Sequence, residues 1–340
     1  MKRILCCLIS ILFLSLGSPI AAPADEAPYT YGIWAPDWQI NAALYDLDSL
    51  PVPFEKVIAF ACIFDLHDQP LMLTCTEKLL FTLQDRFAGT DTEVYLSVVN
   101  DIEVEPEEYD YKNSELLFRL FADEDTMRSH IKELAGLIAR YHLTGIEIDY
   151  EYFYDTPDFW NRYAVFIAKV WEMCQQEEAK LRVVLTSEAA QYIELPPGPE
   201  YSVMCYNLYG DHSGPGPKAD LAYLQDTCAL YQPYIPDIRM AFATGGFDWN
   251  GDHVNALTQW EAEEQLHKAG ITPERDPESG ALHCLYSMDN TTHEVWYADA
   301  ETLSIWRDVC AAYGYTAFDF FRLGDINVED WETVLLSKQP

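Results

Sequence analysis

Eight apolar runs rich in β-branched and aromatic residues recur along this chain of 340 residues, and amphipathic stretches separate most of them. This alternation is typical of a parallel sheet covered by helices. Eight such runs in one domain favour a closed barrel over an open doubly wound sheet, so we predict an α/β fold of the (β/α)8 TIM-barrel type. The predicted strands are 31–35, 56–63, 93–99, 145–151, 181–187, 201–206, 238–244 and 315–321.

The predicted connections differ in length. Before the fourth strand, Asp125 can cap a helix with an apolar face. The members of that face are Met127, Ile131, Leu134, Leu137 and Ile138. The connection between the fifth and sixth strands contains Pro-Pro-Gly-Pro at 196–199, so its helix is brief or absent. Between strands seven and eight we predict a small α+β insertion at about 246–300, with a hairpin at 283–287 and 293–298 and a helix at 300–312.

Residues 1–24 read as a signal peptide. Lys2 and Arg3 precede an apolar run at 4–16, and small residues and prolines follow. The apolar run is too short to span a bilayer stably. We therefore expect residues 25–340 to form one exported domain, secreted or periplasmic, and to be a monomer.

The chain is strongly acidic, with 56 Asp and Glu against 21 Lys and Arg and a net charge of −35. Such a charge repels phosphate backbones and anionic membranes, so we expect neither nucleic acid nor membrane as a partner. Cysteines and histidines show no metal-ligand spacing, and no phosphate-binding glycine motif occurs, so we expect no metal and no cofactor. Seven cysteines follow the signal peptide, and their pairing is not readable from the sequence.

The fourth predicted strand carries three acids at alternate positions, Glu147, Asp149 and Glu151. Alternation places them on one face, with apolar side chains on the other, and in a barrel covered by helices the acids must then point inward. Neighbouring carboxylates ~6–7 Å apart cannot all ionise cheaply, so one should stay protonated near neutral pH, as a general acid requires. Glu151 lies nearest the carboxyl end, where barrel active sites sit. The alternative is an amphipathic strand whose acids face solvent.

Residues 144–151, Thr-Gly-Ile-Glu-Ile-Asp-Tyr-Glu, resemble the signature Asp-Gly-x-Asp-x-Asp-x-Glu of glycoside hydrolase family 18, the chitinase-like family. The last Asp and Glu are kept, whereas Thr144 and Glu147 replace the first two acids. The family's second motif, Ser-x-Met-x-Tyr-Asp on strand six, is similar to residues 202–207, which end in Asn207. Alternation points Ser202, Met204 and Tyr206 inward, so the two motifs can face each other.

The resemblance covers residues 30–335 and is greatest to the branch that includes bacterial spore-cortex-lytic N-acetylglucosaminidases. Residues 246–249 resemble its Gly-x-x-Trp turn after strand seven, and residues 295–299 its Val-Trp-(Tyr/Phe)-x-Asp segment. Residues 321–324 resemble the Trp-x-Leu-Gly that ends strand eight, but Phe321 replaces the Trp and offers a smaller platform for a sugar.

This resemblance implies a retaining hydrolase of glycans that contain β-linked N-acetylglucosamine, such as chitin oligomers, peptidoglycan or the core of N-glycans. In that family the substrate assists catalysis, an exception to the scheme with two carboxylates. Glu151 would protonate the glycosidic oxygen while the substrate's own acetamide attacks the anomeric carbon. Asp149 would orient the acetamide, Tyr206 would bind its oxygen, and Glu147 would tune Asp149.

Other candidate residues for substrate binding lie at or just after strand ends. They are Trp34, Asn100, Met204, Asn207, Trp249, Trp296 and Phe321. Aromatic rings can stack on the apolar face of a sugar, but core packing would explain each ring as well, and turn chemistry would explain Asn100.

Two other interpretations of the whole chain stay open at this point. A chitinase-like lectin could keep the groove and lack the chemistry, and Thr144, Glu147 and Phe321 favour it, although Glu151 is retained. A barrel with unrelated chemistry would require the match on strand six to be accidental. Function is therefore to be decided by the site and not by the fold.

Overall fold

Eight parallel strands close into a barrel in the computed structural model, which describes residues 29–50, 54–152, 156–288, 290–328, 330–331 and 334. The barrel strands are β1 (Thr30–Pro36), β2 (Lys56–Phe64), β4 (Glu93–Glu105), β6 (Gly145–Asp149), β7 (Lys180–Thr186), β8 (Glu200–Met204), β9 (Ile238–Ala243) and β15 (Ala317–Phe321). Closure is complete because β2 pairs in parallel with both β1 and β4, and β1 pairs in parallel with β15, the last strand. The predicted fold class is confirmed, and all eight predicted strands occur. The predicted signal peptide lies outside the described residues.

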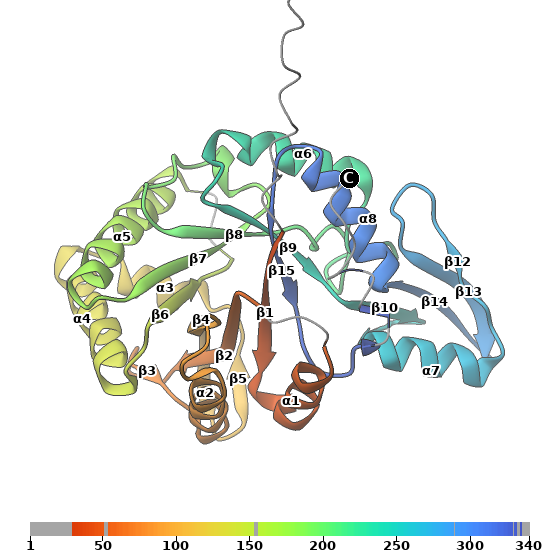
Figure 1. Ribbon diagram of the computed structural model, residues 1–340, viewed down its shortest axis with the longest axis horizontal. Coiled ribbons are helices and arrows are strands. Elements are labelled where there is room, and N and C mark those ends of the chain that lie inside the picture. The colour runs from red at the N-terminus through yellow and green to blue at the C-terminus, as the bar shows by residue number, and fades with distance from the viewer. Residues whose placement is uncertain are drawn as a thin grey trace, which may run out of the picture.

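Helices cover the outside of the barrel (Figure 1). They are α1 (Ile40–Ser49), α2 (Thr74–Phe87), α3 (Ser114–Leu120), α4 (Glu124–Tyr141), α5 (Pro157–Gln176), α6 (Leu221–Tyr231) and α8 (Ala300–Ala311). Between β7 and β8 the described chain has only the short 3-10 turn Ala189–Gln191, as its prolines predict. Two short strands, β3 (Pro70–Leu71) and β5 (Glu108–Asp110), extend β2 and β4 in antiparallel pairs.

The cap of α4 differs from the prediction. Asp123, not Asp125, is the N-cap, and its Oδ1 accepts the N–H groups of Asp125 and Thr126 at 2.9 Å each. The Thr126 hydroxyl accepts the Asp123 N–H at 3.1 Å, which completes a capping box. Both acids precede the same apolar stripe, so the sequence pattern could not separate them.

Alternation along the strands sorts side chains between two cores. On β6, Ile146, Ile148 and the following Tyr150 point outward into the large core beneath the helices. A smaller apolar core fills the inside of the barrel. Its members are Trp34, Ile58, Tyr95, Val184, Met204 and Ala241, with Phe60, Tyr206 and Phe321 packed against them.

A second, antiparallel sheet is formed by the chain segment that follows β9 and precedes β15 in the sequence, and it lies on the right in Figure 1. It contains β10 (Gly245–Asn250), β11 (His253–Leu257), β12 (Glu274–Arg275), β13 (Leu282–Met288) and β14 (Thr291–Ala298), with α7 (Gln259–Ala269) after β11. The predicted hairpin is β13 and β14. Residues 246–249, expected as a turn, are instead part of β10. Gly245 has φ +63°, and a Cβ there would lie 2.2 Å from the Leu257 carbonyl oxygen, so the chain needs glycine to enter this sheet.

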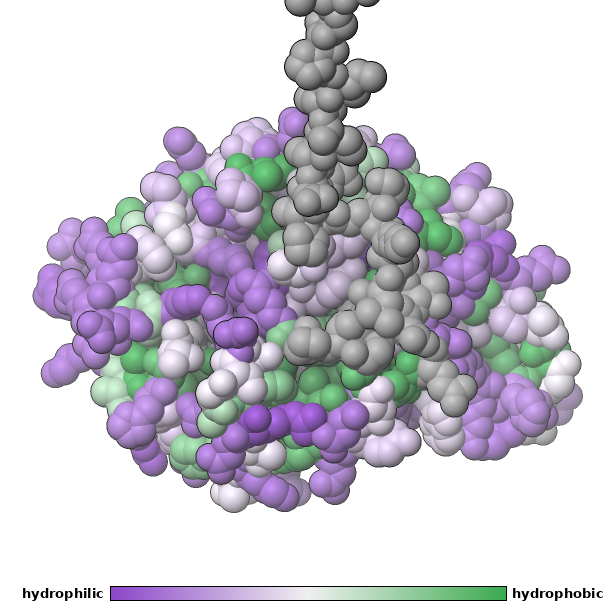
Figure 2. Space-filling view, in the orientation of Figure 1, coloured by the Kyte–Doolittle hydropathy of each residue, from purple (hydrophilic) through white to green (hydrophobic). Residues whose placement is uncertain are grey.

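The surface is hydrophilic, as expected for a chain of high charge: Figure 2 shows hydrophilic side chains over much of the visible face. All seven cysteines of the described ranges are free thiols, and six of them are buried. Among the described helices, none is both long and apolar enough to cross a bilayer.

Candidate active site

The three acids of the fourth barrel strand point into the barrel, as alternation predicts. Glu147 is fully buried and Asp149 is 7% exposed. Glu151, just past the end of β6, has a side chain that is 13% exposed. The acids therefore form a column that rises from the interior to the mouth, by which we mean the carboxyl ends of the barrel strands. The alternative of a strand with its acids in solvent is excluded.

Glu147 is held by two neighbours on other strands. Its Oε1 accepts the indole N–H of Trp34 at 2.7 Å, and its Oε2 accepts the Nε–H of Arg182. Arg182 also donates from Nη2 to Asp319 at 2.8 Å, so one guanidinium joins two buried carboxylates. Burial raises the pKa of Glu147, and Arg182 acts in the opposite direction. Trp34 is only 2% exposed, so it braces the column from below and presents little surface to a ligand.

Asp149, the middle acid, has no cation in contact in the described ranges. Burial raises its pKa well above the usual value, and the charges of Glu151 and Glu147 raise it further. Its Oδ1 is buried without a hydrogen-bond partner among the described residues. We expected one acid of the three to be protonated near neutral pH and gave the acid role to Glu151. Burial and the neighbouring charges thus favour the protonated form of Asp149, the middle acid, in the free protein.

Glu151 has a cationic partner that we did not predict from the sequence. The Lys112 ammonium lies 2.8 Å from Glu151 Oε1 and 2.9 Å from Oε2. Lys112 is 39 residues away, in the loop between β5 and α3. Its pKa is raised, because Glu151 and Asp149 outweigh the opposite effect of burial. No local pattern could reveal this pair, since it depends on where the loop after β5 crosses the mouth.

Asn100 fixes the backbone of Glu151. Its Oδ1 accepts the Glu151 N–H at 2.9 Å, and its Nδ2 donates to the Glu151 carbonyl at 3.0 Å and to the Asn113 carbonyl at 3.2 Å. The residue is 1% exposed. We predicted that Asn100 contacts substrate, but here its amide is occupied by protein groups. It acts on the site through Glu151.

The Asn100→Ala variant is expected to lose about 1–3 kcal/mol of unfolding free energy, because backbone groups of Glu151 and Asn113 would lose their partners. Urea unfolding followed by tryptophan fluorescence measures this loss. Asn255→Ala, at an exposed position of β11, is the control and should change stability by less than about 0.5 kcal/mol. Equal stability of the two variants would contradict the bracing role of Asn100.

Tyr206 and Phe321 form an aromatic wall across the mouth. Their rings stack with centroids 6.1 Å apart at 14°, and Phe60 packs edge-on against Phe321 at 5.7 Å. Burial raises the pKa of Tyr206 well above its usual value, and Asp149, Glu151 and Glu147 raise it further, in that order. The tyrosine of the second motif thus lies within the field of the acids of the first.

The other residues of the second motif lie on β8 or just after it. Met204 is buried in the inner core, and Ser202 donates to Asp319 inside the barrel at 2.8 Å. Asn207 is exposed, and its amide lies 3.8 Å from the Met204 sulfur. Ser202, Met204 and Tyr206 therefore point inward as predicted, and Asn207 keeps its side chain at the surface.

Trp249 and Trp296 lie on one face of the second sheet. Trp296 pairs across the strands with Phe247, two residues before Trp249. Phe247 on this face lies against the Lys218 ammonium, 5.0 Å from the ring centre, and Lys218 belongs to the loop after β8. Trp249 is 8% exposed, whereas Trp296 is half-buried and donates to Glu294 at 3.1 Å. Neither tryptophan hydrogen-bonds to the acids of the column in the described part of the chain.

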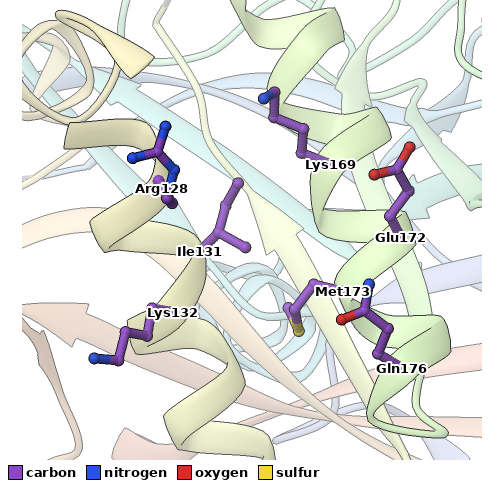
Figure 3. A pocket seen from close by; sticks show the side chains of 7 residues that line it. All are labelled: Arg128, Ile131, Lys132, Lys169, Glu172, Met173 and Gln176. Atoms are coloured by element: carbon purple, nitrogen blue, oxygen red, sulfur yellow. The ribbon is translucent and has the colours of Figure 1, made fainter. Parts of the chain in front are cut away.

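A separate hollow lies on the outside of the barrel, between α4 and α5 (Figure 3). It is lined by Arg128, Ile131, Lys132, Lys169, Glu172, Met173 and Gln176. None of the predicted site residues lines it.

Within the ranges that the structure describes, no group of three or more His, Cys, Asp or Glu side chains could hold a metal ion. We therefore place the candidate site at the mouth, around Asp149, Glu151 and Tyr206.

Solved structures with similar folds include chitinases. The chitinase from Chromobacterium violaceum superposes with a TM-score of 0.76 at 16% identity, over 92% of this chain and all of that one (100%). The spore cortex-lytic enzyme SleL of Bacillus cereus gives 0.74 at 16% identity, over 93% of this chain and 76% of that one. A class V chitinase from Nicotiana tobaccum, in complex with NAG4, gives 0.72 at 12% identity, over 90% and 99%.

The comparisons by sequence find nothing: no protein-family model matches the chain, and no curated protein matches it. The structural neighbours therefore establish a shared fold. Two of these neighbours are named as chitinases and one as a spore cortex-lytic enzyme, and residues 144–151 and 202–207 resemble motifs of the chitinase-like family. What the site does has to be argued from its own residues.

Proposed function

We propose that this protein is a retaining glycoside hydrolase that cleaves glycans containing β-linked N-acetylglucosamine, with the substrate's acetamide as the nucleophile. One observation carries the proposal: Asp149, Glu151 and Tyr206 converge at the mouth of the barrel, and Asp149 Oδ1 is buried without a partner among the described residues. A buried carboxyl oxygen without a partner is costly, and a ligand that supplies an N–H removes that cost.

Each group has a distinct task in this scheme. Glu151, at the open end of the column, gives a proton to the glycosidic oxygen. Asp149 accepts the acetamide N–H, which turns the acetamide oxygen toward the anomeric carbon, and its negative charge stabilises the oxazolinium ion that forms. The Tyr206 hydroxyl donates to the acetamide oxygen. Glu147, neutralised by Arg182, keeps the column in place from below.

Three neighbours with the same fold support the choice of substrate class. Two are named as chitinases, one of them in complex with NAG4, and the third as a spore cortex-lytic enzyme. Residues 1–24 have the features of a signal peptide, so we also propose that the protein is exported to a compartment in which such glycans occur. Chitin oligomers, peptidoglycan fragments and N-glycan cores are the substrates to compare.

A second candidate function is a carbohydrate-binding protein without turnover. The Lys112–Glu151 ion pair favours it, because an ionised carboxylate cannot give a proton. Incubation with a 4-nitrophenyl chitobioside, combined with calorimetry on chitotetraose, separates the two. Release of 4-nitrophenol supports the hydrolase. Binding of chitotetraose without release supports the lectin, and neither binding nor release would contradict both.

Asp149→Asn is expected to lower the rate of release by about 10²–10³-fold, because the developing positive charge loses its anionic partner. The loss should be the same for good and poor aryl leaving groups, since Asp149 acts on the nucleophile. Initial rates with 4-nitrophenyl and 2,4-dinitrophenyl substrates check this. Asp85→Asn, at an exposed position of α2, serves as the control. Normal cleavage by Asp149→Asn would show that the acetamide mechanism is wrong.

A further inference from the structure

Lys112 is fixed at both ends at the mouth of the barrel. Its backbone has φ +53°, in the left-handed region, and its N–H donates to Asp101 Oδ1 at 2.7 Å. Its ammonium contacts both oxygens of Glu151 and lies 5.1 Å from the ring centre of Tyr152. The left-handed conformation is uncommon for a residue with a side chain, and together with these contacts it fixes where Lys112 lies.

The acids of the column are not balanced evenly by cations. Glu147 has Arg182 and Glu151 has Lys112, whereas Asp149 between them has no direct cationic partner among the described residues. Two charged pairs therefore flank one carboxyl group without a cation, and burial raises the pKa of that group. The two cations differ in exposure: Arg182 is fully buried, and the Lys112 side chain is 41% exposed. Of the two, only Lys112 lies where an entering ligand can reach it.

The surroundings of the Lys112–Glu151 pair are otherwise acidic or neutral. Asp149 approaches from β6, Asp101 from β4 and Asp110 from β5, and the Tyr152 and Tyr206 hydroxyls complete the set. Because no second cation contacts Glu151 in the described chain, removal of Lys112 would leave the mouth with uncompensated negative charge. That charge would favour the protonated forms of both Glu151 and Asp149.

We propose that Lys112 is a positioning residue that holds Glu151 as a carboxylate while the site is empty and is displaced when the sugar of the leaving group enters. This proposal rests on the proposed hydrolase function. Once the ammonium withdraws, Glu151 can take up a proton from solvent and act as the acid, and Asp149 can release its own proton to solvent and face the reacting acetamide as the anion. Lys112 thus sets the pH range in which the free enzyme is ready to react.

The first test reads the ion pair without turnover. Lysines are converted to ¹³C-dimethyl-lysine, which keeps their charge, and Lys112→Arg identifies the Lys112 signal by NMR. We expect Lys112 to titrate at a pH higher by about one unit in the wild type than in Glu151→Gln. Addition of chitotetraose to the slow variant Asp149→Asn should move the signal toward its position in Glu151→Gln. A signal that is the same in wild type and Glu151→Gln, or that ignores bound chitotetraose, would overturn the proposal.

The second test is the pH profile of kcat/KM for Lys112→Gln. Without the ammonium, both limbs of the profile should move to higher pH by about one unit with a similar maximum, because both acids then hold their protons more strongly. Lys112→Arg should restore the wild-type limbs. Lys180→Gln, which breaks the ion pair with Glu93 at the opposite end of the barrel, is the matched control. A merely structural role would lower the rate at every pH and leave the limbs in place.

The two tests separate this proposal from the proposed function. If the NMR signal responds to Glu151→Gln and to chitotetraose but no substrate is cleaved, the ion pair is displaceable and the hydrolase function fails. If substrate is cleaved and the Lys112→Gln limbs do not move, the hydrolase function stands and the role of Lys112 is wrong.

Discussion

The Glu151→Gln variant is expected to hydrolyse 4-nitrophenyl chitobioside about 10²–10⁴ times more slowly than the wild type, because glutamine cannot give a proton to the glycosidic oxygen. Glutamine keeps the size of the side chain and can still accept a hydrogen bond from Lys112, so the geometry of the mouth should persist. Initial rates at saturating substrate measure the effect on kcat. Chitotetraose should bind to the variant with little change, since the loss concerns the transition state.

Leaving groups of different acidity make this prediction specific to a general acid. A 2,4-dinitrophenyl group departs as a stable anion and needs little protonation, so its release should suffer much less than release of 4-nitrophenol. Asp149→Asn should show no such difference, which distinguishes the two carboxyl groups. Glu105→Gln, at an exposed position of β4, controls for the loss of one negative charge. A uniform loss for both leaving groups in Glu151→Gln would remove Glu151 from the acid role.

Arg182→Met is expected to cost about 3–5 kcal/mol of unfolding free energy, because it leaves a buried carboxylate without its cation. The guanidinium joins Glu147 to Asp319, and all three side chains are fully buried. Asp319 keeps a second cation, since Arg239 Nε donates to it at 2.8 Å, so Glu147 is the group left uncompensated. Urea unfolding at neutral pH measures the change.

Two further variants isolate the cause. Arg119→Met breaks the ion pair with Asp68, in which both side chains are partly exposed, so the loss should stay below about 1 kcal/mol. The double variant Arg182→Met/Glu147→Leu removes the stranded charge and should recover part of the loss. If the double variant were no more stable than Arg182→Met, lost packing rather than unpaired charge would explain the result.

The fold could be predicted well from the sequence because its signals are local. Strands in a barrel covered by helices are apolar outside, and alternation along a strand then decides which side chains point inward. This reasoning placed Glu147, Asp149 and Glu151 on one inner face and Tyr206 on another strand facing them. The helix cap was misplaced by two residues because Asp123 and Asp125 are equivalent in pattern.

The partners of the acids could not be predicted. Lys112 and Glu151 are 39 residues apart, Arg182 and Glu147 are 35 apart, and Asn100 and Glu151 are 51 apart. Each pair joins different elements of the barrel, and no spacing in the sequence encodes them. The contact of Asn100 with Glu151 was not predictable either, because it arises only when β4 and β6 pair. Without that contact, Asn100 at the end of a strand was expected to bind substrate.

The sequence by itself determined that three acids would line the inside of one strand, because a side chain's direction along a strand follows from covalent geometry. Only the tertiary structure decided which of the three acids has a cationic partner, since that depends on the strands and loops that come to lie beside each acid. Arg182 pairs with Glu147 and Lys112 pairs with Glu151, whereas Asp149 between them has no cationic partner among the described residues, and burial raises its pKa.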